Sequence, residues 1–245
     1  MAQNIYDQDD FFAGYSALRR SREGLAGAPE WPSLQAMLPP LRGRRVVDLG
    51  CGFGWFCRWA QQEGAASVLG LDLSEKMLAR ARAEGGGARY ERADLETLVL
   101  PEGAFDLAYS SLAVHYVADF PRLARTVAAS LAAGGRFVFS MEHPLYTAPT
   151  APGWVEHEGR RVWPLDAYLA EGERRTDWLA QGVLKHHRSI ATVVNALLAA
   201  GLRLARLVEW GPDAAQIAAQ PEWAAERDRP PFLLVAADRP GPGSA

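Results

Sequence analysis

A glycine-rich loop between a short apolar run and an aromatic, amphipathic run constrains the fold more than any other feature of this chain. The apolar run 45–49 predicts a strand, the loop Gly50-Cys-Gly-Phe-Gly54 follows it, and a helix is expected from Trp55 to about Glu63. Glycines at such a junction let the backbone turn tightly and approach a ligand closely. The first N–H groups of the helix add hydrogen-bond donors there. The loop therefore predicts an α/β fold with a ligand site where the strand ends.

The same alternation of apolar runs and amphipathic stretches continues along the chain, which is the pattern of repeated βα units. Further strands are expected at 67–72, 88–92, 105–110 and 136–141, and helix N-caps at Ser74, Asp119 and Ser189. Gly134-Gly135 is expected to end the helix that Asp119 begins. Two late apolar runs, 202–210 and 231–237, are expected to pair antiparallel at the sheet edge. The pattern predicts a mostly parallel, seven-stranded sheet.

Asp72 ends the second predicted strand, 22 residues after Gly50. A carboxylate at this position can accept hydrogen bonds from both hydroxyls of a ribose, so the loop and Asp72 together indicate a nucleoside-containing cofactor. The dinucleotide fingerprint G-x-G-x-x-G needs a third glycine where this chain has Trp55, and an indole there would crowd a pyrophosphate. No Gly-Lys-Ser or Gly-Lys-Thr follows the loop, which excludes a Walker A loop. A nucleotide-dependent oxidoreductase is therefore disfavoured.

Several motifs, taken in order, resemble a known family. The segment Val46-Val-Asp-Leu-Gly-Cys-Gly-Phe-Gly54 is similar to motif I of the class I S-adenosylmethionine (SAM) dependent methyltransferases, of the bacterial small-molecule type. The resemblance continues over residues 44–140, through Leu71-Asp72-Leu-Ser74 with Met77, Ala93-Asp94-Leu95, Phe105–Ser110 with Leu112–Tyr116, and Leu131–Val138. It implies SAM as cofactor and S-adenosyl-L-homocysteine as product.

The resemblance also implies which residues hold SAM. Gly50 and Gly52 would line its methionine part, and Asp72 would bind the ribose. Leu73 and Met77 would flank the adenine ring. The alternative interpretation of Asp72 is a simple helix-entry residue.

Further cofactor contacts are implied in the same way. Asp94 would accept a hydrogen bond from the adenine amino group, and Leu95 would offer backbone contacts. Ser110 would lie beside the methionine part through its backbone. N-terminal aromatic and basic residues often close over SAM in this family, and Tyr15 with Arg19 or Arg20 are the candidates here. The alternative for Asp94 is a turn residue after a strand.

A general base is needed only if the methyl acceptor carries a proton on its nucleophilic atom, because the sulfonium of SAM is already a good leaving group. His115 and His143 follow the fourth and fifth strands and are the candidates, with Tyr116 and Glu142 as alternatives. The other interpretation is that His115 lines the cofactor pocket and that His143 caps the turn before Pro144.

Residues 145–188 break the alternation and are rich in Trp, Arg, Gly and Pro, without clear periodicity. In the family that the chain resembles, insertions at this place commonly cover the substrate. The residues expected to face the substrate are Tyr116, Tyr146, Trp154, Trp163, Trp178 and His186. A self-packed surface excursion or a dimer contact is the alternative. No metal site is expected, because Glu142, His143, His186 and His187 do not supply a carboxylate-rich ligand set.

The charge balance and the apolar runs of the chain limit the kinds of molecule that it is expected to bind. The 26 Lys and Arg residues against 29 Asp and Glu give a net charge of −3 without a basic block, which disfavours nucleic acid. No apolar run approaches the ~20 residues that span a bilayer, so no membrane partner is expected. The N-terminus is polar and acidic, and Cys51 and Cys57 cannot form a disulfide framework or a four-ligand zinc site. We therefore expect a cytoplasmic protein, a monomer or a homodimer.

The predicted organisation is one Rossmann-like α/β domain over residues 1–245, with an antiparallel edge strand, helices on both faces and an aromatic cap insertion. Its parts are an N-terminal helical flap (1–43), a SAM-binding core (44–144), a substrate cap (145–188), a C-terminal helix with edge strands (189–240) and a disordered tail (241–245). The expected activity is methyl transfer to an O or N nucleophile of a small molecule. A non-catalytic SAM-binding or sensor protein is the alternative, because a binding motif does not establish turnover.

Overall fold

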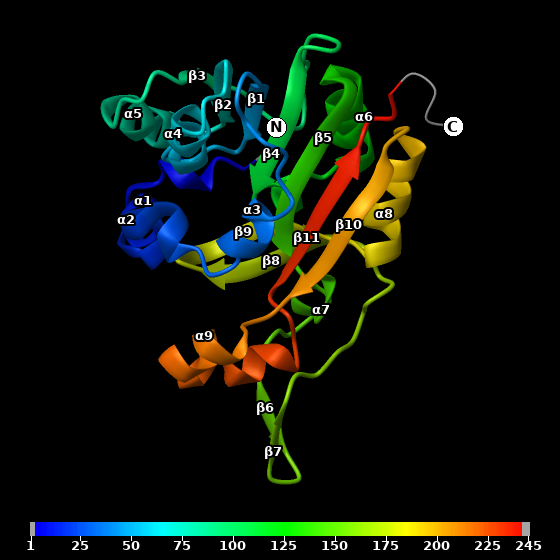
Figure 1. Ribbon diagram of the computed structural model, residues 1–245. Helices are drawn as coiled ribbons and strands as arrows, with labels where there is room; N and C mark the ends of the chain where they lie inside the picture. Colours follow the sequence, from blue (N-terminus) through cyan, green and yellow to red (C-terminus); the bar gives the residue numbers. More distant parts are fainter. Residues whose placement is uncertain (1–2, 242–245) are drawn as a thin grey trace.

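Strands at the centre of the computed structural model, which describes residues 3–241, form one continuous sheet (Figure 1). They are β1 (Arg45–Leu49), β2 (Ser67–Asp72), β3 (Arg89–Arg92), β4 (Phe105–Ser111), β5 (Leu131–Glu142), β10 (Arg203–Trp210) and β11 (Phe232–Asp238). Their order is β10-β11-β5-β4-β1-β2-β3. β11 runs antiparallel to both neighbours, and the remaining neighbours pair in parallel. The mostly parallel, seven-stranded sheet is confirmed, with β11 lying just inside the edge strand β10.

Helices cover both faces of the sheet, among them α4 (Trp55–Gln62), α5 (Glu75–Ala83), α6 (Phe120–Ser130) and α8 (Ile190–Ala199). Each of the three predicted N-caps accepts a hydrogen bond from a backbone N–H group in the first turn of its helix; these caps are Ser74, Asp119 and Ser189. The helix starts that the sequence indicates are therefore confirmed.

Alternate residues of the central strands enter two separate hydrophobic clusters. Val47 of β1 and Phe139 of β5 pack in the cluster that contains residues of α6 and α8. Val46 and Val138 pack in the cluster that contains residues of α4 and α5. Because both faces of the parallel strands are covered in this way, a ligand can reach them only at their ends, and in such sheets the carboxyl ends carry the site.

The boundary between α6 and β5 differs from the expectation. α6 ends at Ser130 and β5 begins at Leu131, so Gly134 and Gly135 lie inside the strand. Gly134 has a φ of +76°, and the pairing of β5 with β4 shifts register near the start of the strand. The predicted helix end was wrong because the two glycines form an irregularity in a strand, where positive φ is also needed.

Short helices precede the sheet: η1 (Ile5–Asp7), α1 (Asp9–Ala17), α2 (Arg19–Glu23), η2 (Gly24–Gly27) and α3 (Trp31–Gln35). Ile5 and Phe11 are buried against Val183, which is far away in the sequence. The N-terminal segment is thus packed on the part of the chain that follows β5.

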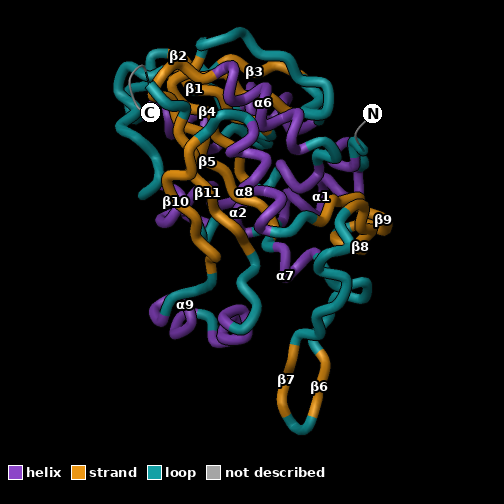
Figure 2. The backbone as a smooth tube through the Cα atoms, turned by 90° about the vertical axis from the view of Figure 1, so that its right-hand side faces the viewer, coloured by secondary structure: helices purple, strands orange, loops and turns teal. Residues whose placement is uncertain are grey.

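Residues 144–187 are more ordered than their lack of periodicity suggests. They form α7 (Pro144–Thr147) and two hairpins, β6 (Val155–His157) with β7 (Arg160–Val162) and β8 (Gly172–Trp178) with β9 (Ala180–His187). The β6–β7 hairpin projects from the body of the molecule, whereas β8–β9 lies beside α1 (Figures 1 and 2). The expectation of an irregular segment is corrected accordingly.

Between β10 and β11 the chain forms α9 (Ala214–Ala219) and η4 (Pro221–Arg227). The predicted disordered tail falls largely on residues 242–245, which lie outside the described residues. Across residues 3–241, no helix is both long enough and apolar enough to cross a membrane.

Candidate functional site

A cavity of about 420 Å³ lies at the carboxyl ends of the parallel strands. It is lined by the glycine loop after β1, the end of β2, the residues after β3 and β4, the N-terminal helices, β8 and the residues after η4. β1 is flanked by β2 on one side and β4 on the other, so the strand order reverses at this point. Open α/β sheets bind ligands at such a switch point.

The glycines of the loop have different roles. A Cβ on Gly50 would lie 2.4 Å from the Cβ of Ala113, and one on Gly54 would lie 2.3 Å from the hydroxyl of Tyr90, so a side chain at either position would clash. A Cβ on Gly52 would meet nothing within 4 Å. Gly52 therefore leaves its backbone open to the cavity, where a ligand can approach closely.

Asp72 faces the same part of the cavity and is tied to the loop. Its Oδ2 accepts a hydrogen bond from the N–H of Gly52 at 2.8 Å, and its Oδ1 accepts one from the N–H of Ser74 at 2.9 Å. Burial raises the pKa of this carboxyl. A carboxylate has about four acceptor positions, so acceptor capacity is left for the two hydroxyls of a ribose. The residues present therefore fit a nucleoside-containing cofactor.

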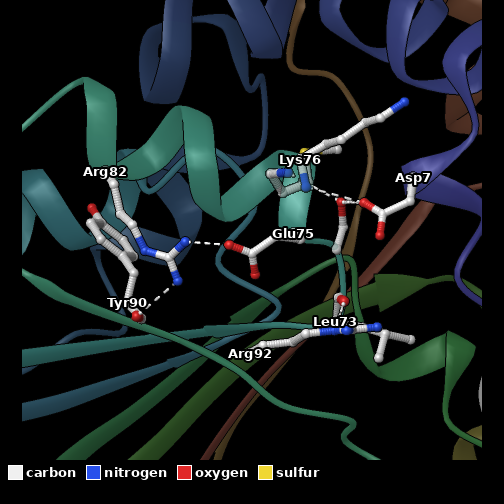
Figure 3. A network of polar contacts seen from close by, with 9 residues as sticks. Asp7, Leu73, Glu75, Lys76, Arg82, Tyr90 and Arg92 are labelled. Atoms are coloured by element: carbon white, nitrogen blue, oxygen red, sulfur yellow. Dashed lines mark hydrogen bonds and ion pairs between the residues drawn. The ribbon is translucent and has the colours of Figure 1, made fainter.

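The residues that follow Asp72 are held by Asp7 and Arg92 (Figure 3), neither of which lines the cavity. Asp7 accepts hydrogen bonds from the hydroxyl of Ser74 at 2.5 Å and from the N–H of Lys76 at 3.1 Å, at the start of α5. The side chain of Arg92 donates to the carbonyl of Leu73 at 3.0 Å. These contacts fix these residues and also attach the N-terminal segment to the core.

The sequence-predicted cofactor residues are brought together, with one exception. The cavity is lined by Tyr15, Gly50, Gly52, Asp72, Leu73, Met77, Asp94, Leu95 and His115. Ser110 is fully buried and its hydroxyl donates to the carbonyl of Leu49 at 2.7 Å. It does not line the cavity, and its neighbours Ser111 and Leu112 do. The contact expected of Ser110 is corrected in this way.

Of the two N-terminal arginines, Arg20 reaches the cavity. Its guanidinium lies 2.9 and 3.0 Å from the two carboxylate oxygens of Glu30, whose side chain is fully buried. Arg19 instead pairs with Glu23 on the surface. Both Arg20 and Glu30 line the cavity, and no sequence motif indicated Glu30.

Aromatic side chains from separate segments also line the cavity, and we call the space that they border the aromatic chamber: Tyr6, Tyr15, Tyr116 and Trp178. Edge-to-face contacts place the ring of Tyr6 5.2 Å from that of Tyr15 and 5.9 Å from that of Tyr116. The hydroxyl of Tyr6 donates to that of Tyr116 at 3.1 Å. Sequence reasoning missed Tyr6 because no motif surrounds it.

Glu142, the last residue of β5, lines this chamber and forms an ion pair with a buried lysine. Nζ of Lys185, on β9, lies 2.5 Å from Oε1 of Glu142, and the Lys185 side chain is only 2% exposed. Burial raises the pKa of Glu142, and the positive charges of Lys185 and Arg229 oppose part of that rise. Sequence reasoning placed Glu142 among the weaker candidates and did not find Lys185.

The two candidate histidines have different surroundings. His115 lines the cavity, and its Nδ1 accepts a 3.4 Å hydrogen bond from the N–H of Glu142. Burial lowers the pKa of His115 well below its usual range, with Lys185 and Arg188 adding to the effect. The imidazole is therefore neutral.

His143 does not reach the cavity, which corrects the expectation of a base at this position. Its Nδ1 accepts a hydrogen bond from the N–H of Leu145 at the start of α7, and its Nε2 lies 3.0 Å from Glu209. With both ring nitrogens occupied and the side chain fully buried, His143 caps a helix.

Some of the cap residues expected to face the substrate line the cavity, and others do not. Tyr146 and Trp178 line the cavity, whereas Trp154, Trp163 and His186 do not. Trp163 and Trp154 instead contact Arg229. Its guanidinium lies 4.3 Å from the ring centre of Trp163 and 5.5 Å from that of Trp154. Arg229 itself lines the cavity but sits in a polar segment with no periodic signal. Within residues 3–241, no group of three or more His, Cys, Asp or Glu side chains is arranged to hold a metal ion.

Comparison with known proteins gives consistent matches. A methyltransferase domain family model matches residues 47–139. The crystal structure of an S-adenosylmethionine-dependent methyltransferase from Mesorhizobium loti is 63% identical, has a TM-score of 0.85, and is matched over 88% of this chain and 100% of its own. A candidate enzyme of the same kind from Listeria monocytogenes is 38% identical with a TM-score of 0.81, over 88% and 99% of the two chains.

A malonyl-[acyl-carrier protein] O-methyltransferase from Pectobacterium atrosepticum is 43% identical over 89 residues, which are 36% of this chain and 35% of that enzyme. That similarity is thus restricted to about a third of each chain, whereas the similarity to the Mesorhizobium loti enzyme covers all of its structure. The motifs, the sheet order and these matches agree, and the chain belongs to the class I S-adenosylmethionine-dependent methyltransferase family.

Proposed function

We propose that the protein transfers the methyl group of SAM to an oxygen or nitrogen nucleophile of a small molecule. The observation that carries this proposal is the continuity of the cavity. The same space is bordered by Asp72 and Asp94, which are expected to bind the nucleoside, and by the aromatic chamber with Tyr116 and Trp178. A second molecule held in that chamber would lie in the same enclosure as the cofactor, away from bulk water.

The family resemblance, together with the lining residues, supports a division of roles. Asp72 would hold the ribose, the side chains of Leu73 and Met77 would flank the adenine ring, and Arg20 with Glu30 would face the methionine part. The cofactor supplies a methyl group bonded to a positively charged sulfur, which is a good leaving group. The chain must then orient the acceptor and take up its proton, if it carries one.

The size and chemistry of the enclosure favour a small acceptor. Its volume of about 420 Å³ is within the range of small-molecule sites, and its aromatic walls suit a flat or apolar body with polar groups. The net charge of −3 gives no support to a nucleic-acid substrate. The O-methyltransferase to which the core is similar agrees with an oxygen acceptor but matches only a third of this chain.

The test is transfer of label. Purified protein is incubated with methyl-labelled SAM and a metabolite extract of the host, and the products are separated by size. We expect label in a low-mass product, with none in protein or nucleic acid. Label confined to macromolecules would overturn the small-molecule assignment. Measured SAM binding without label in any fraction would favour the non-catalytic SAM-binding protein.

A further inference from the structure

Glu142 has a carboxylate oxygen without a partner in the aromatic chamber. Lys185 occupies Oε1, while Oε2 is buried and has no hydrogen-bond partner among the described residues. A buried acceptor that lacks a donor is costly to a fold, and it is best satisfied by a donor that arrives with a ligand. Because Glu142 lines the cavity, an O–H or N–H group of a bound molecule is the natural donor.

Glu142 is the group in the chamber that can accept a proton, because its charged and titratable neighbours cannot. Two neighbours are cations, Lys185 on β9 and Arg229 in the segment after η4. Two are tyrosines that interact electrostatically with Glu142, Tyr116 in η3 (Val114–Tyr116) and Tyr146 in α7. Burial raises the pKa of both tyrosines, so their hydroxyls stay protonated. They can donate hydrogen bonds to a ligand but are poor proton acceptors.

His115 is a donor rather than a base in this geometry. Its Nδ1 already accepts the backbone N–H of Glu142, and the ring is neutral, so the proton of the imidazole is on Nε2. A ring in this tautomer offers an N–H group and has no free basic nitrogen. The proton-accepting role therefore moves from His115 to the adjacent carboxylate.

The charges in the chamber are already compensated. Glu142 is paired with Lys185, and Arg229 is paired with Glu226, which also lines the cavity. A carboxylate on the acceptor would add a negative charge beside the free oxygen of Glu142, while Lys185 and Arg229 are each already in an ion pair. A neutral group that carries a proton meets no such repulsion. The buried Nε–H of Arg229, which has no partner among the described residues, can donate to a neutral oxygen or nitrogen of the acceptor. Trp178, with Lys185 5.2 Å from its ring centre, offers a flat surface for the body of the acceptor.

We propose that Glu142 takes the proton of the methyl acceptor, and that the acceptor is therefore a small molecule with a neutral hydroxyl or amine on an aromatic or apolar body. This inference rests on the proposed function. The lone pair of the acceptor atom forms the bond to the methyl carbon, the carbon–sulfur bond breaks with its electrons on sulfur, and the acceptor proton passes to the Glu142 carboxylate. Lys185 is a positioning residue that keeps this carboxylate oriented and ionised.

The experiment compares Glu142→Gln with the matched surface variant Glu102→Gln, whose parent side chain is exposed. Product from labelled SAM and host extract is treated with mild alkali, which releases methanol from methyl esters but leaves methyl ethers and methylamines intact. We expect alkali-stable label in the wild type and in Glu102→Gln. The rate should fall about 100-fold in Glu142→Gln, the loss typical of a general base. Binding of S-adenosyl-L-homocysteine by calorimetry should remain within about twofold.

A second readout does not depend on turnover. Infrared difference titrations of the free wild type and of Glu142→Gln should differ by a carboxylic-acid band that persists above the pH at which an ordinary glutamate ionises and that only the wild type shows. The buried carboxyls of Asp48 and Asp72 contribute equally to both titrations and cancel in the comparison. Lys185→Met should move the band and the acid limb of the pH–rate profile to higher pH, with activity recovering as the pH is raised. This variant keeps the test decisive if Glu142→Gln does not fold.

Three results would overturn the inference: alkali-labile label in the wild type, a Glu142→Gln variant with more than about half of the wild-type rate, or an unchanged infrared titration. A wild type that binds S-adenosyl-L-homocysteine but labels no small molecule would instead overturn the proposed function itself.

Discussion

The carboxylate of Asp72, at the end of β2, accepts a hydrogen bond from the backbone N–H of Gly52, in the loop after β1, at 2.8 Å. This single contact joins two segments at the rim of the cavity and fixes the distance between them. The glycine loop therefore supplies an open backbone surface at Gly52, and the aspartate supplies acceptors beside it.

Removal of this carboxylate tests the ribose assignment. Asp72→Ala should weaken SAM binding by at least about tenfold. It removes the oxygens expected to accept hydrogen bonds from the ribose hydroxyls, and it leaves the N–H of Gly52 without its acceptor. The measurement is isothermal titration calorimetry, with Asp10→Ala, an exposed aspartate of α1, as the control. Equal affinity of Asp72→Ala and the wild type would contradict the assignment.

The glycine loop also predicts a stability difference between two glycine substitutions. Gly54 and Gly85 have similar φ angles, +71° and +69°, but a Cβ would strike Tyr90 only at Gly54. Both Gly→Ala variants carry the cost of left-handed backbone, and Gly54→Ala adds the clash. We expect Gly54→Ala to lower the free energy of unfolding in urea by about 1–3 kcal/mol more than Gly85→Ala does. Equal losses would show that Tyr90 moves away freely.

Asp48 should make stability depend on pH. Burial raises its pKa to about 7 from an ordinary value of 3.8, although a hydrogen bond from Cys57 to its Oδ2 acts in the opposite direction. A carboxyl whose pKa is higher in the folded state stabilises fully below pH 3.8 and loses that contribution as the pH rises through about 7.

The corresponding measurement is the free energy of unfolding between pH 4 and pH 8 for the wild type and Asp48→Asn. The amide cannot ionise but keeps an oxygen that can accept the hydrogen bond from Cys57. A shift of this size corresponds to at most about 4 kcal/mol, and Asp48→Asn should remove that part of the slope. Parallel curves for the two proteins would mean that Asp48 ionises normally in the folded state.

The capping role of His143 predicts a structural effect without loss of cofactor binding. His143→Ala removes the acceptor for the N–H of Leu145 and the contact with Glu209. We expect the free energy of unfolding to fall by about 1–2 kcal/mol, as for other lost caps, while SAM affinity stays within about twofold. If His143→Ala has normal stability and binds SAM but no longer methylates, the capping role would be contradicted and His143 would be a catalytic residue.

Local sequence signals predicted the core of this fold well. Apolar runs, capping residues and glycines act over a few positions, and β1, β2 and the helix after Ser74 lie where those signals placed them. The cofactor side of the site follows from the same signals, because the glycine loop and Asp72 stand at strand ends that any sheet of this kind brings together.

The chamber could not be predicted in the same manner, and β9 shows why. Its inward positions Val183, Lys185 and His187 are buried while Leu184 and His186 are only half-buried. The alternation of a strand is present in burial but absent in hydropathy, because two inward residues are polar and held by specific partners. Arg229 likewise lines the cavity although it is distant in sequence from the glycine loop, and no local sequence pattern predicts this position.

The most direct test of the central claim is a paired measurement of product and cofactor. Purified protein is mixed with SAM and host extract, and S-adenosyl-L-homocysteine is quantified together with any metabolite that gains the mass of one methylene. We expect a low-mass metabolite that gains this mass in a one-to-one ratio with S-adenosyl-L-homocysteine, and less of both in Asp72→Ala when SAM is kept below saturation. Bound SAM that stays intact in every extract, with no S-adenosyl-L-homocysteine formed, would contradict the central claim.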